Sequence, residues 1–586
     1  MHVSRRQLVL WIALAATTAA HGQNPAPSMS TPKTPAPLTA KPAELCTLEG
    51  RVLAADTGEP LRKARVIMVR EQTLTPQTPG TNQAAQRMRQ FVATTDQEGH
   101  FIFKELDSGR YTLSATRNGY AQQYYGATAA NRPGTPLTLA PGSNTKDIAL
   151  RMTRAAVISG RVLDNDGEPL SYVGVQAMQY GYQRGQRMLR PRGYGQTDDR
   201  GMYRIHDLPP GKYYVSATYR DPGQVEFVRD GTVSTEADMS YPTTYYPATT
   251  DAASAQAMLV RAGEEQEVDF QLVPQRAVSV RGRVINAATG KPAINSSVFV
   301  LPRSSITSGF FGNFSSTAYV QNAEGEFQLR GILPGAYVLM TQQMDEGKRY
   351  SAYMNLDVGT QDVEGVQLVL SAGSTIEGQV RIEGPPLPAG RPPVTVLLTQ
   401  ATFLPLSGFG GSARVKDDGS FVIENLGQGS YRVNVNNAGE TSYLKSVRMG
   451  NQDLLDKELV VQTGAKLQPL EIVVSQNAGA VQGAVEDGDH KPWAGAQVVL
   501  VPERKNELGR LFASGRSDQY GHFSVRGITP GKYRVYAFEQ IEAGAWQDPE
   551  FMRKYEDRGS RVEIGESSQP SLTLKLIPAS ETSADQ

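Results

Sequence analysis

The chain of 586 residues repeats one pattern of glycine and tyrosine five times. Within the segment Thr94 to Ala115, a glycine is followed ten residues later by a second glycine, and a tyrosine stands two positions beyond it. The first glycines are Gly99, Gly201, Gly325, Gly419 and Gly521; the tyrosines are Tyr111, Tyr213, Tyr337, Tyr431 and Tyr533. Repetition of this kind predicts a tandem array of one structural unit.

A Gly-x-Val element precedes each copy and gives the spacing of the units. It starts at Gly50, Gly160, Gly282, Gly378 and Gly483, so successive copies lie 110, 122, 96 and 105 residues apart. A unit of about 100 residues can bury its own hydrophobic core. We therefore expect separate modules rather than a solenoid.

Residues after the first glycine of each copy alternate in hydrophobic character. An aromatic residue stands two positions after it and an apolar one four positions after it, in the pairs Phe101/Phe103, Tyr203/Ile205, Phe327/Leu329, Phe421/Ile423 and Phe523/Val525. Such alternation predicts strands with one buried face. Asp or Asn three residues before the glycine predicts a type I turn in four copies, whereas the fourth has Lys416 there. About seven short strands per unit are typical of a β-sandwich.

Each copy closes with a further alternating strand, and only 8 to 10 residues separate that strand from the next Gly-x-Val glycine. We therefore expect the modules to abut end to end. The predicted β-sandwich repeats, called repeats 1 to 5 below, are 45–153, 154–275, 276–371, 372–477 and 478–579, followed by a tail at 580–586.

Residues 1–22 have the features of a secretory signal peptide. Arg5 and Arg6 precede an apolar run from Leu8 to Ala20 and a small-residue end at Gly22. The run is too short to span a bilayer, although a buried N-terminal helix is the alternative. Residues 23–44 are rich in proline and predict an extended linker. We expect an exported protein of the periplasm, outer cell surface or medium, with no transmembrane segment in the mature chain.

Composition and motifs argue against several functions. Lys+Arg and Asp+Glu both number 59, and a net charge of zero does not favour nucleic-acid binding. The single Cys46 excludes an internal disulfide framework. The sequence has no Gly-x-Ser-x-Gly elbow, no phosphate loop and no His-x-x-Glu zinc pair. We predict a monomer that is not an enzyme and has no cofactor or metal, with calcium at the turn aspartates as an alternative.

The order of motifs resembles the bacterial carboxypeptidase regulatory-like domain. Gly-Arg-Val is followed by Glu59-Pro60-Leu61 or Glu168-Pro169-Leu170, then Thr-Asp-x-x-Gly-x-Phe/Tyr and Leu-Pro-Pro-Gly-x-Tyr. The resemblance extends over all five copies, from about Leu45 to Pro578, and is loosest in the fourth. It implies an all-β array of transthyretin-like (prealbumin-like) Greek-key sandwiches, grouped with the carbohydrate-binding-like fold. The family name implies an accessory module rather than peptidase activity.

Aromatic clusters are the first group of candidate ligand-binding residues. A Tyr-x-x-x-Tyr-Tyr pattern occurs in repeats 1 and 2, and repeat 5 carries aromatic residues in the corresponding region; the candidates are Tyr120, Tyr124, Tyr125, Tyr241, Tyr245, Tyr246, Trp546 and Tyr555. Exposed rings with polar tips suit stacking on a sugar or anchoring a partner protein. The alternative is that they fill the open end of their own sandwich.

A basic loop in repeat 2 supplies the second group. Four arginines lie among the tyrosines of the segment Tyr180 to Tyr194: Arg184, Arg187, Arg190 and Arg192. Such a loop suits an acidic glycan or phosphate, and simple solvation of the charges is the alternative.

Three functional hypotheses follow from these features. The first is an exported binding protein of the cell envelope with polysaccharide as the leading ligand class. The second is a structural spacer, scaffold or adhesin that engages another envelope protein. The third, an accessory chain of a peptidase, or a hydrolase in its own right, has no catalytic residues to support it. Exposure of the candidate rings distinguishes the first two hypotheses.

Overall fold

A computed structural model describes residues 45–71, 90–183, 185–219, 225–227, 239–303, 316–345, 347–387, 391–401, 410–439, 441–462, 466–504 and 508–582. The stretch Glu44–Gln586 forms one compact unit. The predicted signal peptide and linker, and Arg184 in the basic loop, lie outside the described residues.

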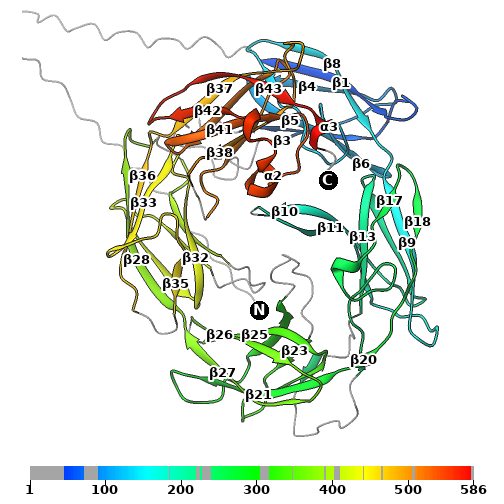
Figure 1. The fold of residues 1–586 in the computed structure, drawn as a ribbon, viewed down its shortest axis with the longest axis vertical. Helices are drawn as coiled ribbons and strands as arrows, with labels where there is room; N and C mark the ends of the chain where they lie inside the picture. Colours follow the sequence, from blue (N-terminus) through cyan, green and yellow to red (C-terminus); the bar gives the residue numbers. More distant parts are fainter. Residues whose placement is uncertain are drawn as a thin grey trace, which may run out of the picture. The chain divides into compact units, whose positions relative to one another are not determined.

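The prediction of an all-β fold is confirmed, and one two-sheet topology recurs in the five repeats (Figure 1). In the first sheet, the Gly-x-Val strand lies between the strand after the turn glycine, which is antiparallel to it, and a closing strand, which is parallel. These first sheets are β4(His100–Leu106)-β1(Cys46–Ala54)-β8(Asn144–Met152), β12(Met202–Leu208)-β9(Ala156–Leu163)-β18(Glu265–Glu267) with β19(Phe270–Gln271), β24(Glu326–Ile332)-β21(Val278–Asn286)-β27(Val363–Ala372), β31(Ser420–Leu426)-β28(Ser374–Glu383)-β36(Leu470–Ser475) and β40(His522–Ile528)-β37(Gly479–Glu486)-β43(Ser571–Ile577).

The second sheet of each repeat is antiparallel and contains the strand with the repeated tyrosine. These second sheets are β3(Gln90–Thr94)-β2(Arg65–Arg70)-β5(Gly109–Arg117)-β6(Tyr120–Tyr124) with β7(Leu137–Leu139), β11(Gln186–Gln196)-β10(Gly174–Gln183)-β13(Gly211–Thr218)-β16(Thr244–Tyr245) with β17(Met258–Val260), β23(Ser316–Tyr319)-β22(Ser297–Pro302)-β25(Gly335–Asp345)-β26(Lys348–Val358), β30(Gly411–Arg414)-β29(Thr395–Gln400)-β32(Gly429–Asn436)-β35(Leu459–Val461) and β39(Ala513–Arg516)-β38(Gln497–Pro502)-β41(Gly531–Phe538)-β42(Ser560–Ile564).

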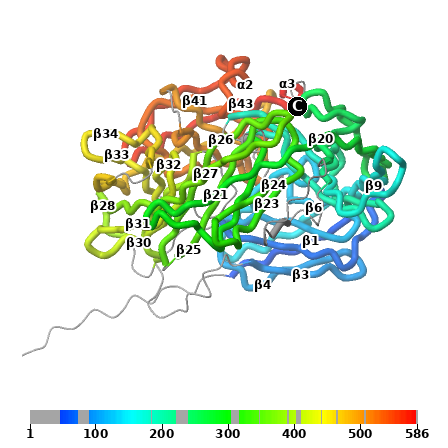
Figure 2. Tube along the Cα trace, turned by 90° about the horizontal axis from the view of Figure 1, so that it is seen from below, coloured from blue at the N-terminus to red at the C-terminus, as the bar shows by residue number. Residues whose placement is uncertain are grey.

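The repeats differ in their additions to this frame. In repeat 3, β26 pairs with both β25 and β27 and joins the two sheets; β21, β26 and β27 lie beside one another in Figure 2. In repeat 5, β41 pairs in parallel with β43 and joins the two sheets there. In repeat 4, β33(Tyr443–Met449) and β34(Gln452–Asp453) extend the first sheet, and in repeat 2, β15(Met239–Ser240) pairs with β20(Gln275–Arg276). Short helices are η2(Ala252–Ser254), η3(Ala545–Gln547), α2(Pro549–Arg553), η4(Glu556–Arg558) and α3(Ala579–Thr582).

One strand crosses a predicted repeat boundary. β14(Val225–Phe227), which belongs to repeat 2, pairs in parallel with β23 of repeat 3. This pairing adds a contact along a sheet edge to the expected end-to-end contact, because β14 lies beside β23, which is the outer strand of the second sheet in repeat 3.

The Gly-x-Val glycines are required by the parallel pairing in the first sheet. A Cβ at Gly483 would overlap the carbonyl oxygen of Leu572 in β43, and Gly282 is equally close to Val366 in β27. Only a residue without a side chain allows the closing strand to approach this closely. The glycine is therefore repeated because the backbones of the Gly-x-Val strand and the closing strand are in contact at this position.

The turn before each first-sheet strand is closed by a side chain. Asp198 accepts a hydrogen bond from the backbone N–H of Met202 at 2.8 Å, and Gly201 at the end of this turn has a φ of 73°. Repeat 4 has Lys416 at the corresponding position, and there Asp418 accepts from the N–H of Ser420 at 2.9 Å instead. A carboxylate thus closes the turn even where the sequence pattern is broken.

The repeated tyrosine both fills the core and closes a loop. Its ring is buried in every repeat, and its hydroxyl donates to the carbonyl four residues earlier, at 2.6 to 2.8 Å, in Tyr111, Tyr213, Tyr337, Tyr431 and Tyr533. A tyrosine hydroxyl that bonds back to the chain at a sheet corner occurs in other sandwiches. Burial also raises the pKa of Tyr533 to about 12.

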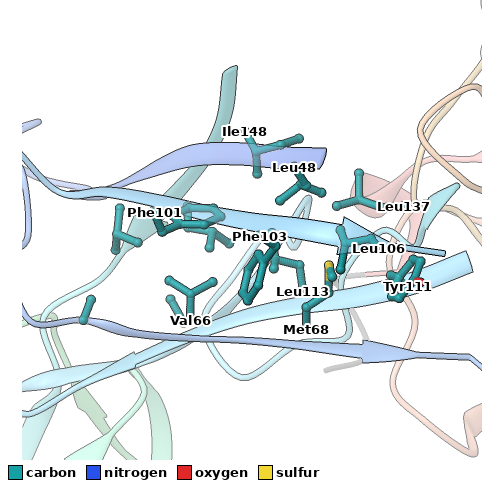
Figure 3. Packing of buried hydrophobic residues seen from close by; sticks show 14 of the residues in the cluster. Leu48, Val66, Met68, Phe101, Phe103, Leu106, Tyr111, Leu113, Leu137 and Ile148 are labelled. Carbon is teal, nitrogen blue, oxygen red and sulfur yellow. The ribbon is translucent and has the colours of Figure 1, made fainter. Parts of the chain in front are cut away.

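Each repeat encloses its own apolar core between its two sheets. Figure 3 shows the core of repeat 1, where Phe101 and Phe103 of β4 meet Val66 and Met68 of β2. The other cores lie within 156–272, 278–370, 376–474 and 481–576. The alternating residues predicted from the sequence are the residues that fill them.

Candidate functional site

The tyrosines of repeat 1 lie at the edge of its second sheet. Tyr120 and Tyr125 are partly buried and pack against the core, and Tyr120 is covered by the guanidinium of Arg117 at 5.2 Å from the ring centroid. Burial raises the pKa of Tyr125. Tyr124 is also partly buried, but it lines a cleft, where its hydroxyl accepts a hydrogen bond from Gln122 at 3.3 Å.

The tyrosines of repeat 2 occupy the corresponding place. Tyr241 and Tyr246 pack against the core of that repeat, and Tyr241 meets Tyr219 edge to face at 5.2 Å between ring centroids. Tyr245 lies in β16, and burial raises its pKa. All three rings are partly buried.

The aromatic residues of repeat 5 belong to a second apolar cluster outside its sandwich core. Tyr555 is 2% exposed and contacts the rings of Phe538 and Phe551 at 5.2 and 5.5 Å, while the partly buried Trp546 packs against the same cluster. Tyr182, at the end of β10 in repeat 2, contributes its ring and meets Phe551 at 6.0 Å. The β10–β11 hairpin therefore docks on repeat 5.

The prediction of a loop for the segment Tyr180 to Tyr194 is wrong, because its described residues form this hairpin and lie mainly in strands β10 and β11. Arg187, Arg190 and Arg192 lie in β11 and are exposed, and Arg187 covers the ring of Tyr180 at 4.4 Å. Their charges act on Glu542 of repeat 5: burial raises the pKa of this carboxyl group, and the charges of Arg132 and of these three arginines oppose the increase. Sequence patterns gave no sign of Glu542 or of the role of Tyr182, because their contacts join distant repeats.

Repeats 1 and 5 also contact each other directly. The amide of Gln519 pairs with the backbone of Thr138, accepting from its N–H at 2.9 Å and donating to its carbonyl at 2.8 Å. The Thr138 hydroxyl donates to Asp518 at 3.1 Å, and Arg110 donates to the carbonyl of Arg516 at 2.6 Å. These contacts join residues that are about 400 positions apart in the chain.

A cleft of about 870 Å³ lies beside this contact. Its walls come from β2, β5 and the loop after β6 in repeat 1, and from β38, β39 and β40 in repeat 5. Four arginines and a single carboxylate line it: Arg70, Arg110, Arg516, Arg526 and Glu71. Tyr124, one of the residues predicted to bind a ligand, lines this cleft.

Within the described residues there is no group of three His, Cys, Asp or Glu side chains arranged to hold a metal ion. None of the helices in these ranges combines the length and the apolar character that a membrane span needs.

One family model matches part of the chain. Residues 47–152 match the carboxypeptidase regulatory-like domain, which confirms the resemblance for the first repeat. No curated protein matches the chain.

Among solved structures, the chain is similar to the minor pilin GBS52 of Streptococcus agalactiae, at 15% identity and a TM-score of 0.22 over 39% of this chain and 96% of the pilin. The TIE protein of Bacillus anthracis is 10% identical, with a TM-score of 0.15, over 92% and 75% of the two chains. BcpA, the major pilin subunit of Bacillus cereus, is 10% identical, with a TM-score of 0.14, over 56% and 99%.

Proposed function

We propose that this protein is an exported, non-enzymatic scaffold of the cell envelope, monomeric and built from the five repeats with the boundaries given above. The observation that carries the proposal is the packing of the candidate rings. Tyr120, Tyr125, Tyr241 and Tyr246 cover the cores of their own repeats, and Tyr555 is buried. A row of exposed rings, which a sugar-binding platform needs, is absent among these described candidates.

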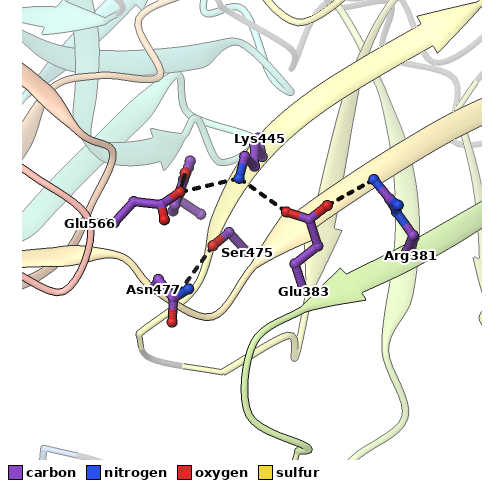
Figure 4. A network of polar contacts seen from close by, with 7 residues as sticks. Arg381, Glu383, Lys445, Ser475, Asn477 and Glu566 are labelled. Atoms are coloured by element: carbon purple, nitrogen blue, oxygen red, sulfur yellow. Dashed lines mark hydrogen bonds and ion pairs between the residues drawn. The ribbon is translucent and has the colours of Figure 1, made fainter.

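Contacts between repeats further support a scaffold. Figure 4 shows Lys445 of repeat 4 between Glu383 of the same repeat, at 3.0 Å, and Glu566 of repeat 5, at 3.2 Å. Tyr443 also donates to Glu566 at 2.7 Å. The N–H of Arg349 in repeat 3 donates to Asn425 of repeat 4 at 3.0 Å. Together with the contacts of repeat 5 to repeats 1 and 2, these bonds favour modules that keep fixed mutual positions.

Glycan binding is the second candidate function, and one observation favours it. Tyr124 differs from the other candidate rings because it lines the cleft between repeats 1 and 5. A concave surface with one aromatic ring and several polar groups is a common form of ligand site.

The Gln519–Thr138 contact gives a direct test of the scaffold. Gln519→Ala in the mature protein removes the acceptor of the Thr138 N–H. We expect hydrogen exchange at Thr138 to become about two- to tenfold faster, since one hydrogen bond contributes about 0.5–1.5 kcal/mol. The matched control is Gln97→Ala, the exposed equivalent position in repeat 1. Equal exchange at Thr138 in the two variants would show that the repeats are not held together there.

A further inference from the structure

The cleft between repeats 1 and 5 carries an excess of positive charge. Two of its arginines are paired: Arg70 with Asp107 at 3.1 Å and Arg110 with Glu71 at 2.8 Å. Arg516 and Arg526 form no ion pair with any residue in the described ranges. The cleft therefore has two guanidinium groups available for an anionic ligand.

The two available arginines, Arg516 and Arg526, differ in their burial. Arg516 is partly buried, and its guanidinium donates to the carbonyl of Gly495 at 2.9 Å, which fixes its position. Burial, and then the positive charge of Arg132, lower the pKa of Arg516 to about 10, so it stays charged at neutral pH. Arg526 is exposed on β40. Two guanidinium groups in one cleft suit repeated carboxylates, which arginine binds in a bidentate manner.

The remaining lining favours a sugar over a peptide. Hydroxyl and amide groups come from Ser108, Thr112, Asn131, Thr138, Gln497, Ser514 and Ser524, whereas the apolar side chains of the lining are Pro133, Pro136 and the ring of Tyr124. The apolar side chains of a peptide would therefore find few apolar partners in this lining. Hydroxyl-rich walls with one ring match the polar edges and the flat face of a sugar.

We propose that this cleft binds a segment of a carboxylated polysaccharide, with Arg516 and Arg526 holding successive carboxylates and Tyr124 supporting a sugar ring. The inference goes beyond the scaffold function: it assigns a ligand class to a surface that exists only where repeats 1 and 5 meet. The site is also distinct from the basic loop of repeat 2, because Arg187, Arg190 and Arg192 do not line the cleft.

The test uses oligogalacturonate and its methyl ester, which has no charge, as probes for calorimetric titration of the mature protein. We expect the acid to bind and the ester to bind at least tenfold more weakly, because charge-assisted bonds are about twice as strong as neutral ones. Arg526→Glu should weaken acid binding by at least tenfold. Lys104→Glu is the matched control, since Lys104 is exposed at the equivalent position of repeat 1 and does not line the cleft.

Three results would overturn the proposal: no binding of the acid, equal weakening by both variants, or tighter binding of polyglutamate than of oligogalacturonate. The last would assign the cleft to an acidic peptide. Raising the salt to about 0.5 M should weaken acid binding in the unaltered protein, as expected for screened charges. If Thr138 exchange responds to Gln519→Ala but the acid does not bind, only the ligand proposal fails and the scaffold stands.

Discussion

Replacement of Gly483 by alanine should destabilise repeat 5 selectively. The Cβ of an alanine there would overlap the Leu572 carbonyl oxygen and lie 2.7 Å from its carbon. That carbon is about 0.8 Å inside the usual contact distance of about 3.5 Å, so β37 and β43 must separate. Overpacking of this kind costs about 1–3 kcal/mol. The φ of 153° at Gly483 adds strain for any residue with a side chain.

The chain offers an assay specific to this repeat. After removal of the predicted signal peptide, the remaining tryptophans, Trp493 and Trp546, both lie in repeat 5. Urea unfolding followed by tryptophan fluorescence therefore reports on repeat 5 and on the hairpin of repeat 2 that docks on it. A loss of about 2 kcal/mol lowers the urea midpoint by about 1 M for a slope of about 2 kcal/mol/M.

The matched control is Gly488→Ala, because a Cβ at Gly488 meets nothing within 4 Å. This variant should be neutral or more stable by up to about 1 kcal/mol, since alanine restricts the unfolded chain. Equal midpoints for the two variants would refute the explanation of the Gly-x-Val element as a backbone contact.

Three further predictions concern tyrosines. Tyr533→Phe should lower the stability of repeat 5 by about 0.5–1.5 kcal/mol in the same urea assay, and an unchanged midpoint would contradict the role of its hydroxyl. Because burial raises the pKa of Tyr533 to about 12 from 10.0, its contribution to stability is complete below pH 10 and is lost as pH rises toward 12; phenolate absorbance near pH 10 that is present in the folded protein but absent from its Tyr533→Phe variant would contradict this. Tyr182→Ala should shift Trp546 emission to longer wavelength by opening the docked hairpin, whereas Tyr194→Ala, 59% exposed on the same hairpin, should not.

Much of the fold follows from local patterns in the sequence. Alternation identified Phe101 and Phe103 as inward-facing, and both are buried in the core of repeat 1. The turn aspartates close their turns as predicted. Each accepts a hydrogen bond from the backbone N–H four residues later, so the interaction is local in the sequence. Strand pairing recurs because each repeat encodes the same glycines.

The candidate site could be predicted only in part. Tyr124 and Tyr125 are neighbours in sequence, yet one lines a cleft and the other packs against the core. Period-two alternation shows which residues share a face, but not whether another repeat covers that face. The Thr138–Gln519 contact joins residues 381 positions apart, and no local pattern encodes it.

The account depends most on the contact between repeats 1 and 5, and cross-linking tests it directly. Thr138→Cys and Gln519→Cys together place two thiols at this contact, while the native Cys46 is buried. A short bismaleimide added to dilute mature protein should then link the two repeats within one chain, detected as a linked peptide pair after proteolysis of the monomer. Labelling of both cysteines without an intramolecular link, or links formed only between different chains, would contradict the account.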